Sequence, residues 1–343
     1  MKVGVLTGGG DCPGLNAVIR AIVRKGIDVY GFEFLGLKDG WAGLLKLQTM
    51  DLDKKAVSGI LYRGGTILGS SRTNPAKSEE DLERALENYK KLGLDALIAI
   101  GGDDTLGAAY TLHKRGINVI GVPKTIDNDL MGTDMTFGFI TAVQIVTDAI
   151  DRLHTTAESH HRVIVVEVMG RHAGWIATYA GIAGGVHMIL VPEEPFDIDE
   201  VCNCITSRKE MGKNYSIIVV AEGAKPVDAE TFATVSGEKD EFGNVRLGGI
   251  GSTLAKEVEK RTGCESRAVV LGHTQRGGTP TAFDRVLSTR YGIAAVDMVA
   301  EGEFGKMTAL RGQKIVPVSL EEAASGNRTL DMELFEMSKI FFG

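Results

Sequence analysis

The chain has 343 residues, of which 43% are hydrophobic and 24% are charged, and its formal net charge is −7. This length suits two domains better than one small domain, and the negative charge argues against a general nucleic-acid partner. No apolar run reaches the roughly 20 residues that a membrane-spanning helix needs. The four cysteines form no zinc-binding pattern, and a chain of this size needs no disulfide bonds. We therefore expect a cytoplasmic protein with no membrane or nucleic-acid partner.

The N-terminal segment combines a short apolar strand with a glycine-rich turn. A strand is predicted over 3–6, the turn Gly8-Gly9-Gly10 follows, and a helix is predicted over about 15–25. A glycine-rich turn at a helix N-terminus exposes backbone N–H groups that suit a phosphate. Glycines also serve any tight strand-to-helix turn, so the turn by itself is weak evidence for a phosphate site.

The next segment ends in an arginine. A second strand is predicted over 29–35, and the loop 36–45 holds Trp41, which could equally flank a ligand or pack in the interior. A stretch rich in Gly and Ser, 63–72, then ends at Arg72. The planar guanidinium binds phosphate through paired hydrogen bonds, whereas most single Arg side chains are simply solvated.

Two polar clusters at the centre of the chain each follow a short apolar run. The runs 97–100 and 119–122 are typical of buried parallel strands, and 105–115 between them is predicted to be the crossover helix. The first run leads into Gly101-Gly102-Asp103-Asp104-Thr105, and the second into Pro123-Lys124-Thr125-Ile126-Asp127-Asn128-Asp129. Open α/β sheets bind ligands at the carboxyl ends of their parallel strands. We therefore expect both clusters to meet at one edge of a sheet.

This edge would carry four carboxylates and one lysine. Carboxylates that lie close together repel, and burying them without a partner is costly. Mg²⁺ is a suitable partner, because it prefers hard oxygen ligands and keeps waters and phosphate oxygens in its shell. The alternative is a pair of turns with solvated Asp side chains, since Asp and Gly are common turn formers. The acids are Asp103, Asp104, Asp127 and Asp129, and the lysine is Lys124.

The second half of the chain repeats the pattern of apolar strands that end in polar residues. Strands are predicted over 163–168, 188–191, 216–220, 268–271 and 313–318, helices over 139–153 and 282–298, and a hairpin around 242–244 within the polar stretch 225–247. The alternation of strands and helices predicts an α/β protein with mainly parallel sheets flanked by helices. The polar residues near these strands include Arg162, Arg171, Glu222, Arg267, His273 and Arg276. Several Arg and a His together suit a sugar phosphate, whereas each of them taken alone is more simply a solvated surface charge.

The two central clusters also carry a family resemblance. Gly-Gly-Asp-x-Thr at 101–105, followed by Pro-x-Thr-Ile-Asp-Asn-Asp at 123–129, resembles the core of the 6-phosphofructokinases, and the resemblance extends from Val3 to about Met298. It implies two similar domains and an active site in the cleft between them. The larger domain, 1–138 with 275–325, would bind the phosphoryl donor and Mg²⁺, and the smaller, 139–274 with 326–343, would bind the sugar phosphate.

The resemblance also implies roles for individual residues on the donor side. Phosphoryl transfer has a loose transition state, so the protein mainly positions and neutralises. Asp127 is expected to be the general base on the sugar 1-hydroxyl, with Thr125 orienting that hydroxyl or a phosphoryl oxygen. The remaining expectations are Arg72 and Arg171 at the transferring group, Asp103 and Asp129 on Mg²⁺, and Gly10 at the donor.

On the acceptor side the resemblance implies fructose 6-phosphate. The residues expected on the sugar are Met169, Gly170, Arg171 and Glu222, beside Thr125 and Asp127, while His273 and Arg276 would hold the 6-phosphate. Arg162 and Arg267 would come from the neighbouring subunit. This sharing implies a homodimer or homotetramer. A related acceptor such as sedoheptulose 7-phosphate stays open, as does control by an effector.

The donor depends on two residues. ATP-using members of the family usually have Gly at the positions of Asp104 and Lys124, and a small residue at 104 leaves room for the α-phosphate. Asp104 fills that room and repels the charge, and it is expected to help fix Lys124, which can hold the terminal oxygens of pyrophosphate. These residues resemble the pyrophosphate-dependent branch, whose reaction yields fructose 1,6-bisphosphate and phosphate, reversibly, in glycolysis or gluconeogenesis. An ATP-dependent kinase and a non-enzymatic sugar-phosphate binder are the alternatives.

Overall fold

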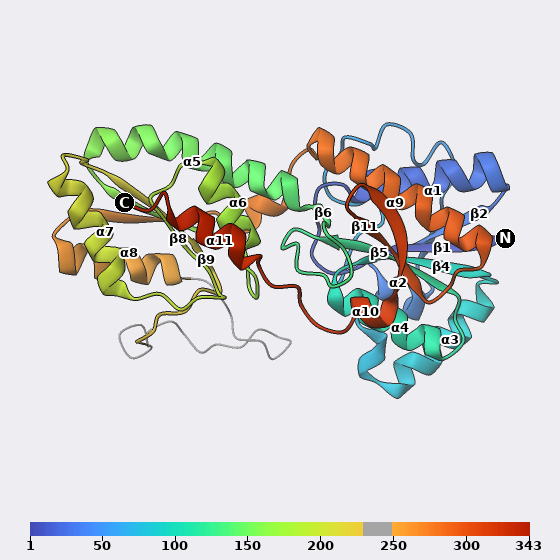
Figure 1. Ribbon diagram of the computed structural model, residues 1–343. Helices are drawn as coiled ribbons and strands as arrows, with labels where there is room; N and C mark the ends of the chain where they lie inside the picture. Colours follow the sequence, from blue (N-terminus) through green and yellow to red (C-terminus); the bar gives the residue numbers. More distant parts are fainter. Residues whose placement is uncertain (229–248) are drawn as a thin grey trace. The chain divides into compact units, whose positions relative to one another are not determined.

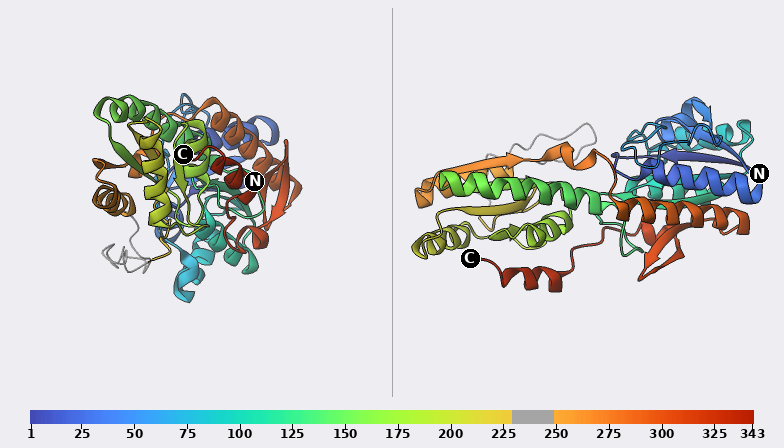
Figure 2. Two further views of the ribbon diagram at one scale, coloured as in Figure 1. Left: turned by 60° about the vertical axis from the view of Figure 1, so that its left-hand side comes forward. Right: turned by 90° about the horizontal axis from the view of Figure 1, so that it is seen from above.

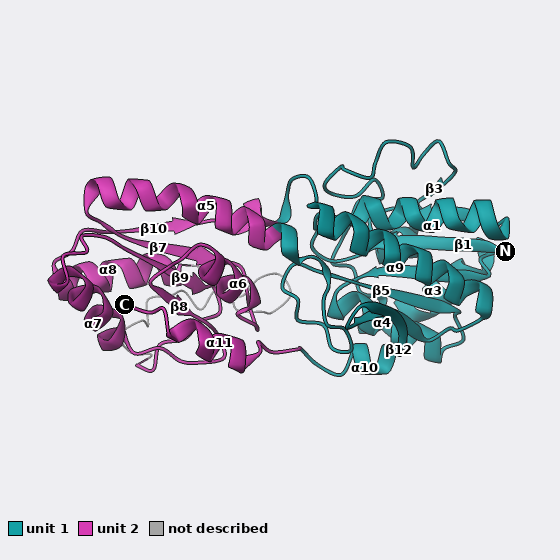
Figure 3. Cartoon of the chain, turned by 45° about the horizontal axis from the view of Figure 1, so that its top comes forward, with its two compact units in different colours: residues 1–141, 276–327 teal, residues 142–275, 328–343 magenta. Residues whose placement is uncertain are grey.

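The computed structural model describes residues 1–228 and 249–343, so the hairpin expected around 242–244 lies outside the described residues. The chain divides into two compact units (Figure 3). Unit 1 comprises residues 1–141 and 276–327, and unit 2 comprises 142–275 and 328–343. Each unit is an α/β layer structure, as the alternation of strands and helices predicts. Among the helices within the described ranges, none is long and apolar enough to cross a membrane.

Unit 1 is built on a mainly parallel sheet with the strand order β12-β11-β5-β4-β1-β2-β3, and β6 pairs with β5. The inner pairs β1–β2, β1–β4, β4–β5 and β5–β11 are parallel, whereas β2–β3 and β11–β12 are antiparallel. The strands are β1 (Lys2–Thr7), β2 (Glu33–Leu37), β3 (Thr49–Asp51), β4 (Ala96–Gly101), β5 (Val119–Thr125), β6 (Phe137–Gly138), β11 (Lys306–Arg311) and β12 (Lys314–Ser319).

Helices cover both faces of this sheet (Figures 1 and 2). The helices of unit 1 are α1 (Leu15–Tyr30), α2 (Trp41–Lys46), η1 (Pro75–Lys77), α3 (Glu79–Lys91), α4 (Asp103–Lys114), α9 (Ala282–Glu301) and α10 (Leu320–Ala323). Helices α1 and α9 pack against each other along one face, while α2, α3, α4 and α10 share an apolar core with the other face. Every residue of β4 is buried, which explains why its sequence is a continuous apolar run.

Unit 2 repeats the layered plan around a smaller, wholly parallel sheet with the order β10-β7-β9-β8. Its elements are α5 (Phe139–His160), β7 (Val163–Val168), α6 (Trp175–Ala183), β8 (Met188–Leu190), α7 (Ile198–Glu210), β9 (Ser216–Ala221), α8 (Ile250–Thr262), β10 (Ser266–Val270), η2 (Gly272–Arg276) and α11 (Met332–Lys339). Helices α7 and α8 bury their apolar faces against one side of the sheet. The chain passes between the units three times, inside α5, at the end of η2, and between Asn327 and Arg328.

Two local expectations are wrong. The segment expected to form a strand from residue 29 is still helical at 29–30, and β2 begins only at Glu33. The helix runs on because its stop signal is Gly31, which adopts a left-handed conformation with φ 64° and donates its N–H to Ile27. Trp41 does not sit in a surface loop but begins α2 and is 1% exposed, within the apolar core of unit 1. It is therefore a packing residue.

Two glycines close together in unit 1 should respond in opposite ways to alanine. A Cβ atom on Gly101 would overlap the side chain of Thr105, whereas a Cβ atom on Gly107, inside α4, would meet nothing within 4 Å. We expect Gly101→Ala to lower the free energy of unfolding by about 1–3 kcal/mol, the usual cost of overpacking. Gly107→Ala should raise it by about 0.5–1 kcal/mol through helix propensity. Urea unfolding of both variants checks this, and a harmless Gly101→Ala would contradict it.

Candidate active site

The ends of three parallel strands in unit 1 bring the predicted donor-side residues together. In register, Thr7 at the end of β1 lies beside Ile100 of β4, and Gly101 lies beside Pro123 of β5. The backbone N–H of Gly8 continues this pattern by donating to Ile100 O at 2.9 Å. The glycine turn after β1 and both polar clusters therefore share one edge of the sheet, as the sequence predicts.

Thr105 lets the first two of these turns approach each other. Its side chain is 4% exposed and lies against the backbone of both Gly8 and Gly101. A Cβ atom on Gly8 would come within 2.6 Å of the Thr105 hydroxyl oxygen, and one on Gly101 would overlap the same side chain. The last residue of the Gly-Gly-Asp-Asp-Thr motif is thus a packing residue, and the glycines are required by steric contact.

The loop that carries Arg72 is fastened to the glycine turn. The N–H of Gly9 donates to Ser71 O at 3.0 Å, and the hydroxyl of Ser70 donates to Gly9 O. Farther back, the buried Asn16 side chain donates to Gly64 O at 3.2 Å and to the preceding carbonyl, and accepts the N–H of Ile67 at 2.8 Å. The Arg72 loop therefore has anchors on both the turn and α1.

Two cations reach the glycine turn. Lys124 is 3% exposed within β5, and its ammonium donates to Gly10 O at 2.6 Å. Burial lowers the pKa of Lys124, while the nearby carboxylates of Asp103 and Asp11 raise it. Arg276 donates to Asp11 O at 3.4 Å, and a Cβ atom on Gly10 would come within 2.6 Å of its Nη1. The anchor of Lys124 is thus Gly10, and not Asp104 as the sequence led us to expect.

Three of the four acids influence one another. Burial is the largest cause that raises the pKa of Asp129, and together with the charges of Asp127 and Asp103 it brings that pKa to about 6. Asn327 donates to Asp129 Oδ2 at 2.9 Å and partly offsets this effect. The Thr125 hydroxyl oxygen accepts the Asp127 N–H at 3.1 Å, which leaves the hydroxyl proton available to another acceptor. The acids therefore form a compact negative region that favours a cation.

This region fits a metal that takes few protein ligands. Within residues 1–228 and 249–343, no three His, Cys, Asp or Glu side chains are grouped closely enough to hold a metal by themselves. Mg²⁺ is commonly bound through one or two carboxylates, with waters and phosphate oxygens completing the octahedron. The raised pKa of Asp129 shows that its negative charge is costly without a counter-ion. Asp103 and Asp129 thus have suitable chemistry for Mg²⁺ bound together with a phosphate.

In unit 2, the ends of β7 and β9 are joined backbone to backbone. Glu222 donates its N–H to Val168 O at 2.8 Å, and Gly223 donates to Gly170 O at 3.1 Å. A Cβ atom on Gly223 would overlap Arg171 O, so only glycine allows the two turns to touch. Gly170 has φ 137°, a value that favours glycine. The expected sugar-binding residues Met169, Gly170, Arg171 and Glu222 therefore lie at one strand edge.

Gln275, a residue that the sequence pattern does not single out, connects the end of β10 to the same edge. Its buried side chain accepts the N–H of Met169 at 3.2 Å and donates to Gly272 O at 3.0 Å. His273 belongs to the same short helix, η2. The sequence shows only a Gln within a polar run, and nothing near it identifies Met169 as its partner.

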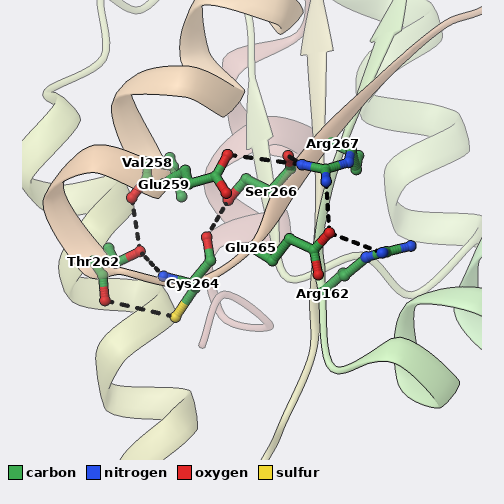
Figure 4. A network of polar contacts seen from close by, with 8 residues as sticks. All are labelled: Arg162, Val258, Glu259, Thr262, Cys264, Glu265, Ser266 and Arg267. Atoms are coloured by element: carbon green, nitrogen blue, oxygen red, sulfur yellow. Dashed lines mark hydrogen bonds and ion pairs between the residues drawn. The ribbon is translucent and has the colours of Figure 1, made fainter.

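Arg162 and Arg267 lie at the opposite end of these strands (Figure 4). Arg162 immediately precedes β7, and Arg267 is the second residue of β10, in register with Ile164. His273, in contrast, lies beyond the end of β10, in η2. The side chains of both arginines instead reach one carboxylate, that of Glu265. The structure thus brings the other sugar-side residues of unit 2 together without these two.

Comparison with known proteins identifies the family. Residues 2–299 match the phosphofructokinase family. The chain belongs to that family. It is 59% identical over its full length, and over the full length of the relative, to the pyrophosphate–fructose 6-phosphate 1-phosphotransferase of Streptomyces coelicolor. It is also 56% identical to ATP-dependent 6-phosphofructokinase 3 of the same organism, over 96% of each chain.

A solved phosphofructokinase has the same fold. The Pichia pastoris phosphofructokinase in the T-state superposes with a TM-score of 0.82 at 32% identity, over 99% of this chain. This chain spans 36% of the length of that phosphofructokinase chain. Relatives that are similarly identical to this chain are named for pyrophosphate in one case and for ATP in another. The choice of donor therefore depends on individual residues.

Asn16 offers a test of how the Arg72 loop is held. We expect Asn16→Ala to lower the free energy of unfolding by about 1–3 kcal/mol, because three partly buried backbone groups lose their hydrogen-bond partner. Amide hydrogen exchange over residues 63–69 should also accelerate more than in the rest of unit 1. Asn88→Ala is a matched control, since Asn88 donates to two carbonyls elsewhere in the unit, at Leu44 and Leu45. Uniform acceleration in both variants would show that Asn16 has no specific hold on this loop.

Proposed function

We propose that the protein transfers a phosphoryl group from pyrophosphate to the 1-hydroxyl of fructose 6-phosphate, giving fructose 1,6-bisphosphate and phosphate. Unit 1 binds pyrophosphate with Mg²⁺, and unit 2 binds the sugar phosphate. The proposal includes reversibility, a place in glycolysis or gluconeogenesis, and a homodimer or homotetramer. It also includes a cytoplasmic location, where free thiols such as that of Cys12 stay reduced.

The exposed carboxylate of Asp104 is the feature that selects pyrophosphate over ATP in this proposal. Asp104 lies on the first turn of α4 and lines a cavity of about 370 Å³ together with Asp103 and Gly107. A longer donor such as ATP would bring its α-phosphate and nucleoside into this region, and the Asp104 charge disfavours that phosphate. Pyrophosphate is short enough to end before this carboxylate. Lys124 and the glycine turn provide the positive charge and N–H groups that suit its oxygens.

Mg²⁺ supplies charge neutralisation to the bound phosphates, and Asp103 and Asp129 are the residues proposed to hold it. The chain's own side chains position the reactants and accept the proton. The sugar 1-hydroxyl oxygen forms a bond to the terminal phosphorus of pyrophosphate, its proton passes to Asp127, and phosphate leaves. The Thr125 hydroxyl oxygen accepts the Asp127 N–H, so the Thr125 hydroxyl proton stays available to orient the sugar hydroxyl. Arg72 and Arg171 offset the charge of the transferring group.

The sugar is held by the joined turns of unit 2. Glu222 accepts hydrogen bonds from sugar hydroxyls, Met169 and Gly170 shape the surface beneath the ring, and His273 binds the 6-phosphate. Arg276 shares the 6-phosphate in this proposal, and its present contact with Asp11 is one that a ligand would have to compete with. Arg162 and Arg267, at the far strand ends, serve the site of a neighbouring subunit.

An ATP-dependent 6-phosphofructokinase is the second candidate. The 56% identity to an enzyme named for ATP favours it, as does the cavity beside Asp104, whose lining also includes Asn74, Thr111 and Asn327. Initial rates with pyrophosphate and with ATP, at saturating fructose 6-phosphate and Mg²⁺, distinguish the two. We expect kcat/KM to favour pyrophosphate, and a preference for ATP would refute the donor assignment.

Asp104→Gly should give measurable ATP-dependent activity, because it removes both the bulk and the charge that oppose the α-phosphate. Asp104→Asn keeps the bulk and removes only the charge, so it should gain less. Because Lys124 is anchored on Gly10, pyrophosphate use should be largely retained in both variants. The measurement is kcat/KM for each donor. If neither variant gains ATP activity, Asp104 does not act by exclusion.

Asp127→Ser should lower kcat by about 10²-fold or more, the scale of a positioned acid–base group, while KM for fructose 6-phosphate changes little. The physical reason is that the transferred hydroxyl proton loses its acceptor. Asp148→Ser, on α5 where Asp148 accepts a hydrogen bond from Gln144, is a matched control that should keep its kcat. Near-normal kcat in Asp127→Ser would remove this residue from the proposed mechanism.

A further inference from the structure

A single carboxylate holds two arginines that the proposed function assigns to substrate. Glu265 Oε1 lies 2.8 Å from Arg162 Nη2 and 2.6 Å from Arg267 Nη2 (Figure 4). A second acid, Glu259, lies farther away, at 3.8 Å from Arg267 Nη1. Both guanidiniums are therefore turned toward an anion that belongs to the chain itself.

Neither guanidinium is saturated by these contacts. Arg162 Nε is buried and has no hydrogen-bond partner within the described part of the chain. The Arg267 side chain is 52% exposed, and among the residues that the structure describes its partners are the two acids and the adjacent carbonyl of Ser266, at 2.9 Å. A guanidinium offers five N–H donors, so the pair retains the capacity to bind a larger anion. A buried polar atom without a partner calls for an explanation. A ligand that accepts the Arg162 Nε–H would provide one.

We propose that Glu265 occupies the place that a substrate phosphate takes on Arg162 and Arg267, and that it must release both arginines before fructose 6-phosphate binds. This inference rests on the proposed function, in which both arginines contact the sugar phosphate. Glu265 is then a residue that sets sugar affinity through competition, and it takes no part in the chemistry.

The physical balance allows such an exchange. Ion pairs between partly exposed side chains are weak, and all three of these side chains are at least partly exposed. A phosphate dianion brings more charge than a carboxylate and matches the fork of the guanidinium. Phosphate can therefore displace Glu265, but every contact that Glu265 gives up reduces the net affinity for the sugar. The hydrogen bond from Arg162, followed by the charges of both arginines, lowers the pKa of Glu265, which keeps it ionised as a competitor.

The fold offers the displaced carboxylate another position. Glu265 lines a cavity of about 360 Å³, together with Lys209 and Lys213. This cavity has room for the side chain to turn, and the two ammonium groups offset part of the lost attraction. Glu265 can thus leave the arginines without becoming an uncompensated charge.

Glu265→Gln tests the proposal, because it keeps the shape of the side chain and removes the competing charge. We expect KM for fructose 6-phosphate to fall by about three- to tenfold, the scale of losing weak ion pairs, with kcat and KM for pyrophosphate unchanged. Glu259→Gln is the matched control and should move the sugar KM by less than twofold, on the order of a weak contact. Glu265→Ala should act in the same direction as Glu265→Gln, and calorimetric binding of fructose 6-phosphate without donor should report the same tightening.

A double-mutant cycle makes the test specific to the arginines. Arg162→Ala and Arg267→Ala should each raise the sugar KM, and adding Glu265→Gln to the double Arg variant should have no further effect. A raised sugar KM in Glu265→Gln would show that Glu265 holds the arginines in place for the substrate, and an unchanged KM would show no competition; either result overturns the inference. If the Arg variants keep a normal sugar KM while pyrophosphate-dependent activity persists, the inference fails and the proposed function stands. Absence of that activity in the wild type overturns the proposed function instead.

Discussion

The close contact of backbone with a single threonine side chain is the constraint on which the donor-side edge of unit 1 depends. Thr105 lies against Gly8 and Gly101, and a side chain at either glycine would push the two turns apart. With the turns together, Lys124 can reach Gly10 from inside β5, and the Ser70–Ser71 stretch can bond to Gly9. The glycines thus serve the approach of one strand end to another before they serve any ligand.

Positive and negative side chains occupy different parts of this sheet edge. Lys124 and Arg276 contact the turn after β1, whereas Asp127 and Asp129 follow β5 and share a negative field with Asp103. A bare polyanion suits the first group and a divalent cation the second. A metal-bound phosphate satisfies both groups at once, which neither a free metal nor a free phosphate does.

Residues whose partners lie nearby in the sequence, or whose pattern is periodic, were predictable. Continuous apolar runs correctly indicated the buried strands β1, β4, β5, β7 and β9, and their polar ends indicated where side chains gather. Asn16 and Gln275 were not predictable, because their partners lie as far as 51 and 106 residues away. The strand expected from residue 29 failed because apolar residues there belong to the last turn of α1, which ends only at Gly31. The division of α5 between the units leaves no local signal either, since the helix is continuous across it.

The order in which strands appear along the chain has a consequence for synthesis. All four strands of the unit 2 sheet lie between residues 163 and 270, whereas the unit 1 sheet includes β11 and β12, at 306–319. During translation, the unit 2 sheet begins later than the unit 1 sheet but has all of its strands first. Until β11 emerges, β5 lacks its partner at Ile120 and Gly121, where unpaired backbone groups beside buried apolar residues are a template for pairing with other chains. Nascent chains stalled after the last strand of unit 2, at 270, and before β11, at 306, would be the ones most in need of a chaperone. Because each unit consists of two separate stretches of the chain, a single cut cannot separate the units.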